Sequence, residues 1–138
     1  VLVQVFDASK VAGRSHLEKA LEYALRSMER GRNIAKTLDM ELMLYASGQR
    51  QIGRALEMGI REGENKVVIL IHPPNEDAVS EIKQHTGIVE EENIEYDDWK
   101  RNELVEFFGI SKEEIDAAGE QKIPQLVVER VVLLDVLK

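Results

Sequence analysis

Residues 46–59 constrain the fold more than any other part of this sequence, because they describe a helix that ends, turns and begins again. The strongly apolar run before them predicts a helix that is buried on more than one side. Gly48 can adopt the left-handed backbone conformation that closes a helix, and helical spacing of apolar residues resumes at Ile52. Between the two helices lie Gln49, Arg50 and Gln51. The turn therefore predicts a platform of amides and one guanidinium, which suits a polar or anionic ligand.

The size and composition of the chain predict an ordinary folded protein. Its 138 residues are the size of one domain, so we expect a single domain over residues 1–138. No apolar stretch approaches the ~20 residues of a membrane helix, and the first residues lack the basic leader of a signal peptide, so we expect a cytoplasmic protein without membrane contact. Many Glu, Lys and Arg residues with no Cys form a pattern reported for thermophilic proteins.

Charge is distributed unevenly along the chain. Residues 1–66 carry 11 Lys and Arg against 9 Asp and Glu, whereas residues 67–138 carry 7 against 17. The net charge of -8 therefore combines +2 in the first part with -10 in the second. This asymmetry is compatible with separate faces for partners of different charge, and equally with a scatter of solvated charges. The absence of cysteine excludes disulfides, thiolate metal sites and cysteine nucleophiles.

The periodicity predicts two strands and several helices. Residues 1–6 and 66–72 are strand-like, and the second run is so continuously aliphatic that we expect a central strand covered on both faces. Ser-x-x-Glu patterns at Ser15 and Ser111 predict capping boxes. Helices are expected over residues 15–30, from residue 37 or 39 to 47, over residues 75–87 with Asn75 as the cap, over residues 98–109 and over residues 111–118.

The C-terminal segment is rich in Val and Leu. Pro124 suits the first turn of a helix and apolar residues recur at helical intervals, so we predict a helix, with a strand as the alternative. Residues 127–137 must be buried in the core or against a partner, which leaves an oligomerisation module open as one class of function. Residues 89–98 are strongly acidic and typical of a solvated connection, without the glycine and ligand spacing of a calcium loop.

No catalytic constellation is recognisable in the sequence. It has no glycine-rich phosphate loop, dinucleotide fingerprint or serine elbow, and no two histidines at helical spacing. Pro73 and Pro74, after the second strand, remove amides that a phosphate would need. His16, His72 and His85 are isolated, so we expect no catalysis, cofactor, metal or small-molecule substrate. The alternative is a small enzyme whose acid and base residues meet only in the fold, around His72 and nearby carboxylates.

The residues around the turn resemble a known family. The pattern consists of residues 42–45, then Ser47, Gly48, Gln49, Arg50, Gln51 and Ile52, then Ala55 with Leu56 and Gly59 with Ile60. Together with residues 33–35, 67–71 and 129–134, this ordered set resembles the small accessory subunit of the KEOPS complex, known in animals as the PRPK-binding protein. The resemblance covers most of the chain and is sharpest over residues 33–71.

The resemblance implies a fold and a role. The implied fold is of the α/β (α+β) class, with a small central, largely antiparallel sheet flanked by several α-helices. The implied role is that of a non-enzymatic regulatory subunit in the threonylcarbamoyladenosine modification of tRNA. Such a subunit binds and stimulates the small kinase-like ATPase subunit of KEOPS, and it helps to recruit tRNA through the single-stranded CCA 3′ end.

Two sets of candidate site residues follow. Cationic groups and amides hold the phosphates and base edges of single-stranded RNA. The expected tRNA-binding residues are Ser47, Gly48, Arg50, Gln51, Arg54 and Lys36, with Arg32 and Lys66 as possible neighbours. For the kinase-like subunit we expect apolar contacts from Met58 and Ile60, and packing of these residues in the core is the alternative. Because Tyr45 is the only aromatic residue near the turn, RNA binding is expected to be weak and salt-sensitive.

Overall fold

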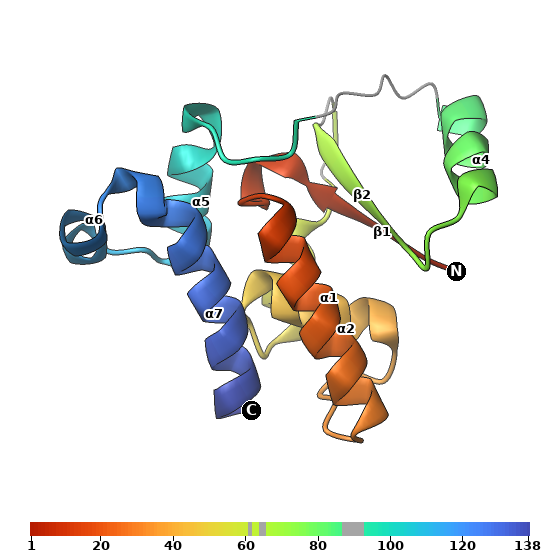
Figure 1. Cartoon of the computed structure of the whole chain (residues 1–138), viewed down its shortest axis with the longest axis horizontal. Helices are drawn as coiled ribbons and strands as arrows, with labels where there is room; N and C mark the ends of the chain where they lie inside the picture. The colour runs from red at the N-terminus through yellow and green to blue at the C-terminus, as the bar shows by residue number, and fades with distance from the viewer. Residues whose placement is uncertain (61, 64–65, 87–92) are drawn as a thin grey trace.

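Helices form most of the protein, whose computed structural model describes residues 1–60, 62–63, 66–86 and 93–138. The elements in chain order are β1 (Leu2–Asp7), the 3₁₀ turn η1 (Ala8–Lys10), α1 (Arg14–Glu29), α2 (Leu38–Ser47), α3 (Ile52–Ala55), η2 (Leu56–Met58), β2 (Val67–His72), α4 (Glu76–Thr86), η3 (Asp98–Lys100), α5 (Arg101–Phe108), α6 (Lys112–Ala118), η4 (Glu120–Lys122) and α7 (Ile123–Leu137). Helices α1, α2 and α7 pack together, while the two strands and α4 lie to one side of them (Figure 1). The predicted α+β class is confirmed.

The sheet is smaller and more open than a central strand would require. In the described residues it has two antiparallel strands, β1 and β2, with Leu2 opposite His72. Within β2 only Val68 is buried, and the other strand residues are half-buried. The strand predicted over residues 66–72 is therefore confirmed, but the prediction that both of its faces are covered is wrong. A continuous aliphatic run lacks the alternation that would show how far each face is covered.

The core lies where α1, α2 and α7 meet. Every residue of α2 from Glu41 onward is buried, as its apolar run predicts. The C-terminal segment is a helix, which excludes the strand alternative, and it places Ile123, Leu126, Val127, Val131 and Leu134 in the core. On its other side Leu133, Val136 and Leu137 remain 50%, 70% and 68% exposed. One face of α7 completes the core, and the other face is apolar and open.

Local sequence determines several helix ends. Gly48 and Gly109, at φ 67° and 62°, close α2 and α5 in the left-handed conformation. The capping box predicted at Ser111 is confirmed, because its hydroxyl accepts the Glu114 amide at 3.1 Å and the Glu114 carboxylate accepts the Ser111 amide at 3.3 Å. The predicted cap at Asn75 also forms, with its side-chain oxygen accepting the Ala78 amide at 2.9 Å.

The start of α1 differs from the prediction. The capping box expected at Ser15 does not form, because α1 begins at Arg14 with Gly13 as its N-cap. The carboxylate of Glu95 accepts the Arg14 amide at 3.1 Å instead. The helix is therefore capped by a residue from a distant part of the chain.

Two further predictions are limited by the range of residues described. Residues 87–92, which include the expected stop at Gly87 and residues 89–92 of the acidic segment, lie outside that range. Across the described residues, no helix has the length and apolar character needed to cross a bilayer. The same residues contain no group of three or more His, Cys, Asp or Glu side chains that could hold a metal ion.

Candidate functional site

The turn between α2 and α3 forms one wall of a surface groove with a volume of about 490 Å³. The opposite wall comes from the C-terminal half of α7. The groove is lined by Gly48, Gln49, Arg50, Gln51, Arg130, Leu133, Leu134 and Leu137, and we call it the turn–α7 groove. Its two walls differ in chemistry, since the turn presents amides and a guanidinium, whereas α7 presents three leucine side chains together with Arg130.

The polar wall is shaped by the end of α2. The amides of Gly48 and Gln49 donate to the carbonyl oxygens of Tyr45 and Leu44, each at 3.1 Å, as in a glycine-terminated helix. Inside the turn, the Ser47 hydroxyl donates to the Leu44 carbonyl oxygen at 3.0 Å and accepts a hydrogen bond from the Gln49 amide at 3.2 Å. Ser47 is buried. Ser47 therefore supports the turn from within, and the surface groups are those of residues 49–51.

Arg50 is one of two arginines that line the groove. Its side chain is exposed, and among the described residues its guanidinium forms no hydrogen bond or ion pair. Gln51 beside it is also exposed. The predicted residues Gly48, Arg50 and Gln51 are thus brought together, with donor groups that are available to a ligand.

Arg54 is held elsewhere. One nitrogen of its guanidinium donates to Glu57 at 2.6 Å, another donates to the Phe107 carbonyl oxygen at 3.2 Å, and the group lies 4.7 Å from the centre of the Phe107 ring. These contacts fasten α3 to α5, and Arg54 does not line the groove. Lys36 and Arg32, on the connection between α1 and α2, are exposed and lie outside the lining too. Lys66 lies over the ring of Trp99, 4.8 Å from its centre.

The two residues expected to contact a kinase subunit are separated by burial. Met58 is 0% exposed and belongs to the core, so the structure assigns it to packing and not to a surface. Ile60 is 60% exposed. Ile52 and Leu56, four residues apart on the preceding segment, are 44% and 53% exposed. Ile60 is therefore an exposed apolar residue, as are Ile52 and Leu56 on the segment before it, and Met58 is not.

The apolar wall of the groove was not predicted as part of the site. Leu133 and Leu137 lie four residues apart on α7, which places them on one side of that helix. The sequence does carry an indication, because α7 is too rich in Val and Leu for all of its side chains to enter one core. Which of them stay outside depends on how α7 packs against α1 and α2.

Arg130 lies in the groove with its guanidinium already engaged. Its Nε donates to the Phe108 carbonyl oxygen at 3.0 Å, and its terminal nitrogens donate to the Leu126 carbonyl oxygen at 3.1 Å and to the Glu114 carboxylate at 3.0 Å. It thereby joins the end of α5 to α6 and α7. Arg130 is a structural part of the groove, in contrast to Arg50.

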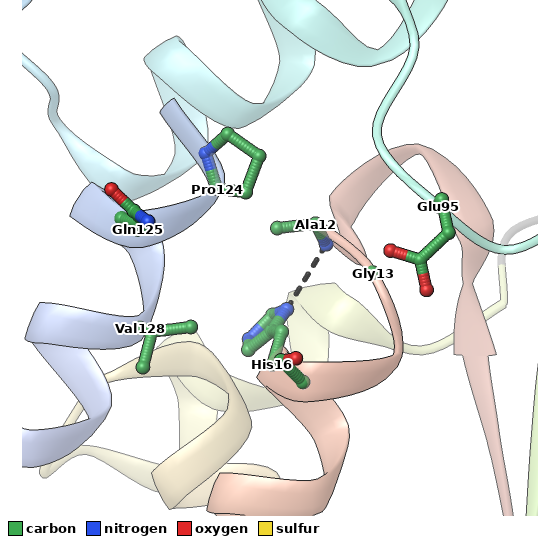
Figure 2. A pocket seen from close by; sticks show the side chains of 8 residues that line it. Ala12, Gly13, His16, Glu95, Pro124, Gln125 and Val128 are labelled. Carbon is green, nitrogen blue, oxygen red and sulfur yellow. Dashed lines mark hydrogen bonds between the residues drawn. The ribbon is translucent and has the colours of Figure 1, made fainter. Parts of the chain in front are cut away.

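A second cavity, of about 220 Å³, lies beside His16 between the start of α1 and the start of α7 (Figure 2). His16 Nδ1 accepts the Ala12 amide at 3.1 Å, so the ring proton is on Nε2, which donates to the Ala46 carbonyl oxygen at 2.7 Å. Burial lowers the pKa of His16 to about 4, which keeps the ring neutral at pH 7. His16 thus joins α1 to α2 through Nε2, and to the connection before α1 through Nδ1. His72 lines neither this cavity nor the turn–α7 groove.

The structure is that of a small α+β protein with a surface groove, in which the buried histidine is bound into the core and the exposed side chains of Arg50 and Gln51 line the groove. A scan against protein families matches residues 2–135 to the family described as kinase binding protein CGI-121, and the chain belongs to that family. This is the KEOPS or PRPK-binding family that the residues around the turn resemble. A search of curated proteins found no match.

Proposed function

We propose that this protein is a non-catalytic, cytoplasmic regulatory subunit of a KEOPS complex, which binds and stimulates the kinase-like ATPase subunit and recruits tRNA through its CCA end. Membership in a kinase-binding family supports the first part. The observation that supports the second part is the turn–α7 groove, where Arg50 and Gln51 face leucine side chains of α7. Single-stranded RNA requires both kinds of group, because its phosphates are charged and its unstacked bases have apolar faces.

The groove would hold RNA by apolar contact and charge. Its volume of about 490 Å³ is within the ~300–1,000 Å³ of typical small-ligand pockets. Tyr45 is fully buried and offers no ring for stacking, so Leu133 and Leu137 are the surfaces on which a base would lie. Arg50 would then pair with a phosphate, and the amides of Gln49 and Gln51 with base edges. Binding without aromatic stacking is expected to be weak alone and to weaken further as salt rises.

The test of the RNA site is the binding of Arg50→Glu to tRNA with and without its CCA end. We expect the substitution to weaken binding of intact tRNA at least 10-fold, whereas tRNA lacking CCA binds parent and variant alike. Lys122→Glu is the matched control, because Lys122 is exposed at the opposite end of α7 and the change in charge is the same. Parental binding of intact tRNA by Arg50→Glu would contradict an RNA role for the turn, and an equal loss in Lys122→Glu would indicate a general effect of charge.

The apolar surface of Ile52, Leu56 and Ile60 is the proposed contact with the kinase-like subunit. These side chains are exposed, and a partner would gain by covering them. We expect Ile60→Glu to abolish capture of the kinase-like subunit in a pulldown while the circular dichroism spectrum is unchanged. Val136→Glu, on the exposed side of α7, is the comparison. Capture lost only in Val136→Glu would move the interface to α7.

The exposed side of α7 also favours a second candidate, self-association through Leu133, Val136 and Leu137. It corresponds to the oligomerisation module that the Val- and Leu-rich sequence of residues 127–137 left open. Sedimentation at several protein concentrations separates it from the first proposal, because a self-associating protein gains mass with concentration and Val136→Glu would abolish that gain.

A further inference from the structure

The rotation of α7 about its own axis is weakly specified by hydrophobic burial. Val127, Val131 and Leu134 face the core, but Leu133, Val136 and Leu137 on the exposed side are equally apolar. A helix that carries large apolar residues on both its buried and its exposed side is oriented less sharply by hydrophobic burial than an amphipathic helix. Polar contacts must therefore help to select which leucines face the turn of residues 48–51. Arg130 supplies such contacts to α5 and α6 in the middle of α7, and a second set lies at its C-terminal end.

Two polar pairs, one partly buried and one buried, join the C-terminal end of α7 to α2. The Tyr45 hydroxyl donates to Asp135 Oδ1 at 2.7 Å. Lys138 Nζ donates to Glu41 Oε2 at 3.0 Å, and the side chains of this ion pair are only 2% and 0% exposed. Lys138 Nζ also donates to the Ser27 hydroxyl and lies 4.5 Å from the centre of the Tyr45 ring. We call Ser27, Glu41, Tyr45, Asp135 and Lys138 the α7 anchor.

Glu41 is the centre of the α7 anchor. Besides Lys138, its carboxylate accepts the Ser27 hydroxyl at 2.7 Å and the amides of Ile34 and Ala35 at 3.0 and 2.9 Å. The charge is therefore surrounded by donors from α1, from the α1–α2 connection and from α7. Hydrogen bonds depend on direction, so these bonds are satisfied in only one placement of α7. Apolar contacts have no such directional requirement and tolerate several placements.

Buried ion pairs contribute little net stability, because desolvation of the two charges offsets their attraction. Their best-attested use is to select one register or orientation among apolar alternatives. The α7 anchor is suited to this use, since Asp135 and Lys138 lie on the same helix turns as Leu134 and Leu137 of the groove.

We propose that the α7 anchor positions the leucine wall of the turn–α7 groove. Glu41, Tyr45, Asp135 and Lys138 are then positioning residues for the ligand, although none of them lines the groove. The part of this inference that concerns RNA rests on the proposed function, whereas the part that concerns the placement of α7 does not.

The test is the double variant Glu41→Gln/Lys138→Met, which removes both charges and leaves the net charge unchanged. We expect it to fold with a melting temperature close to that of the parent. The methyl NOEs between Leu133 or Leu137 and residues 48–51 should weaken or multiply, and affinity for intact tRNA should fall at least 5-fold. The matched control is Arg101→Met/Glu120→Gln, an exposed ion pair of 2.8 Å away from the groove, which should change neither reading.

The outcomes separate the two proposals. If the parent binds tRNA with and without CCA alike, the proposed function fails, and the NOEs still decide the role of the anchor. Parental NOEs in the folded double variant would overturn the positioning role whatever its RNA affinity. If the double variant does not fold, Tyr45→Phe, which removes only the hydroxyl bond to Asp135, replaces it: altered NOEs support the role, and parental NOEs with parental affinity overturn it.

Discussion

Gly48 closes α2 directly against the backbone of Arg130: a Cβ atom at Gly48 would lie 3.1 Å from Arg130 Cβ and 3.4 Å from the Arg130 carbonyl oxygen. The same residue has a φ of 67°, in the region that favours glycine. Gly48 is therefore favoured for two independent reasons, its positive φ and its close contact with Arg130. The contact with Arg130 sets the distance between the two walls of the turn–α7 groove.

Replacing Gly48 with Ala tests this contact against a matched glycine. Gly31 has nearly the same backbone conformation, φ 68°, but a Cβ there would meet no atom within 4 Å. We expect Gly31→Ala to lose about 1 kcal/mol of unfolding free energy, from backbone strain alone. Gly48→Ala should lose roughly 1 kcal/mol more, because the added methyl overpacks the contact with α7. Urea denaturation measures the unfolding free energy of both variants. Equal losses would show that α7 moves to accommodate the added methyl group without a loss of stability.

The burial of His16 predicts a loss of stability in mild acid. Its pKa is lowered by burial from 6.5 to about 4, so below pH 6.5 the unfolded chain binds a proton that the folded protein excludes. Stability from this residue is therefore complete above pH 6.5 and is lost as the pH falls toward 4. The full difference is on the order of 3 kcal/mol. Denaturation midpoints between pH 7 and 4.5 should fall accordingly.

His16→Gln provides the control for that prediction. Gln retains a donor and an acceptor but has no proton to gain in this range. We expect the variant to be less stable than the parent at pH 7, because the bonds to Ala12 and Ala46 are imperfectly replaced, and to lose less stability than the parent on acidification. The same acid slope in both proteins would assign the effect to other groups.

Arg50 and Arg54 are predicted to act differently although they are four residues apart on the same segment. Arg54→Ala removes the bonds to Glu57 and Phe107 and the stacking on the Phe107 ring, and should cost about 1 kcal/mol of stability. Arg50→Ala should leave stability within about 0.5 kcal/mol of the parent and reduce affinity for tRNA. A stability loss in Arg50→Ala as large as in Arg54→Ala would contradict the assignment.

Replacing the serine of each Ser-x-x-Glu pattern with Ala should change stability by different amounts. Ser111→Ala removes a capping box that exists and should destabilise by about 1 kcal/mol. Ser15→Ala changes an exposed residue of α1 that caps nothing, and should be within about 0.5 kcal/mol of the parent. Thermal denaturation of the two single variants side by side is sufficient, and equal effects would contradict the assigned caps.

Features that depend on neighbouring residues were predicted well. The end of α2 at Gly48 and the capping box at Ser111 follow from chemistry within a few residues. The capping box predicted at Ser15 does not form. The amide of Arg14 at the start of α1 donates to the Glu95 carboxylate instead, and the two residues are 81 positions apart. No local pattern contains that contact.

The groove divides in the same way. Its polar wall is one continuous stretch of sequence and was predicted, whereas its apolar wall depends on which side of α7 faces the core. Arg50 and Arg54 carry the same functional group, so the sequence did not distinguish them. In the structure Arg54 is bound to Glu57 and Phe107, whereas Arg50 is exposed. Met58 and Ile60 were likewise equivalent until burial distinguished them.

Two consecutive residues of α7 line the same groove but differ in burial: Leu133 is half-exposed, and Leu134 is also part of the core. Substitutions that alter stability and substitutions that alter ligand binding therefore fall at neighbouring positions of α7. A replacement that fills the core better at Val131 or Leu134 would also tilt the leucines beside it. We expect related chains to vary the two properties together, so that a change of ligand preference is accompanied by compensating changes in the partners of α7.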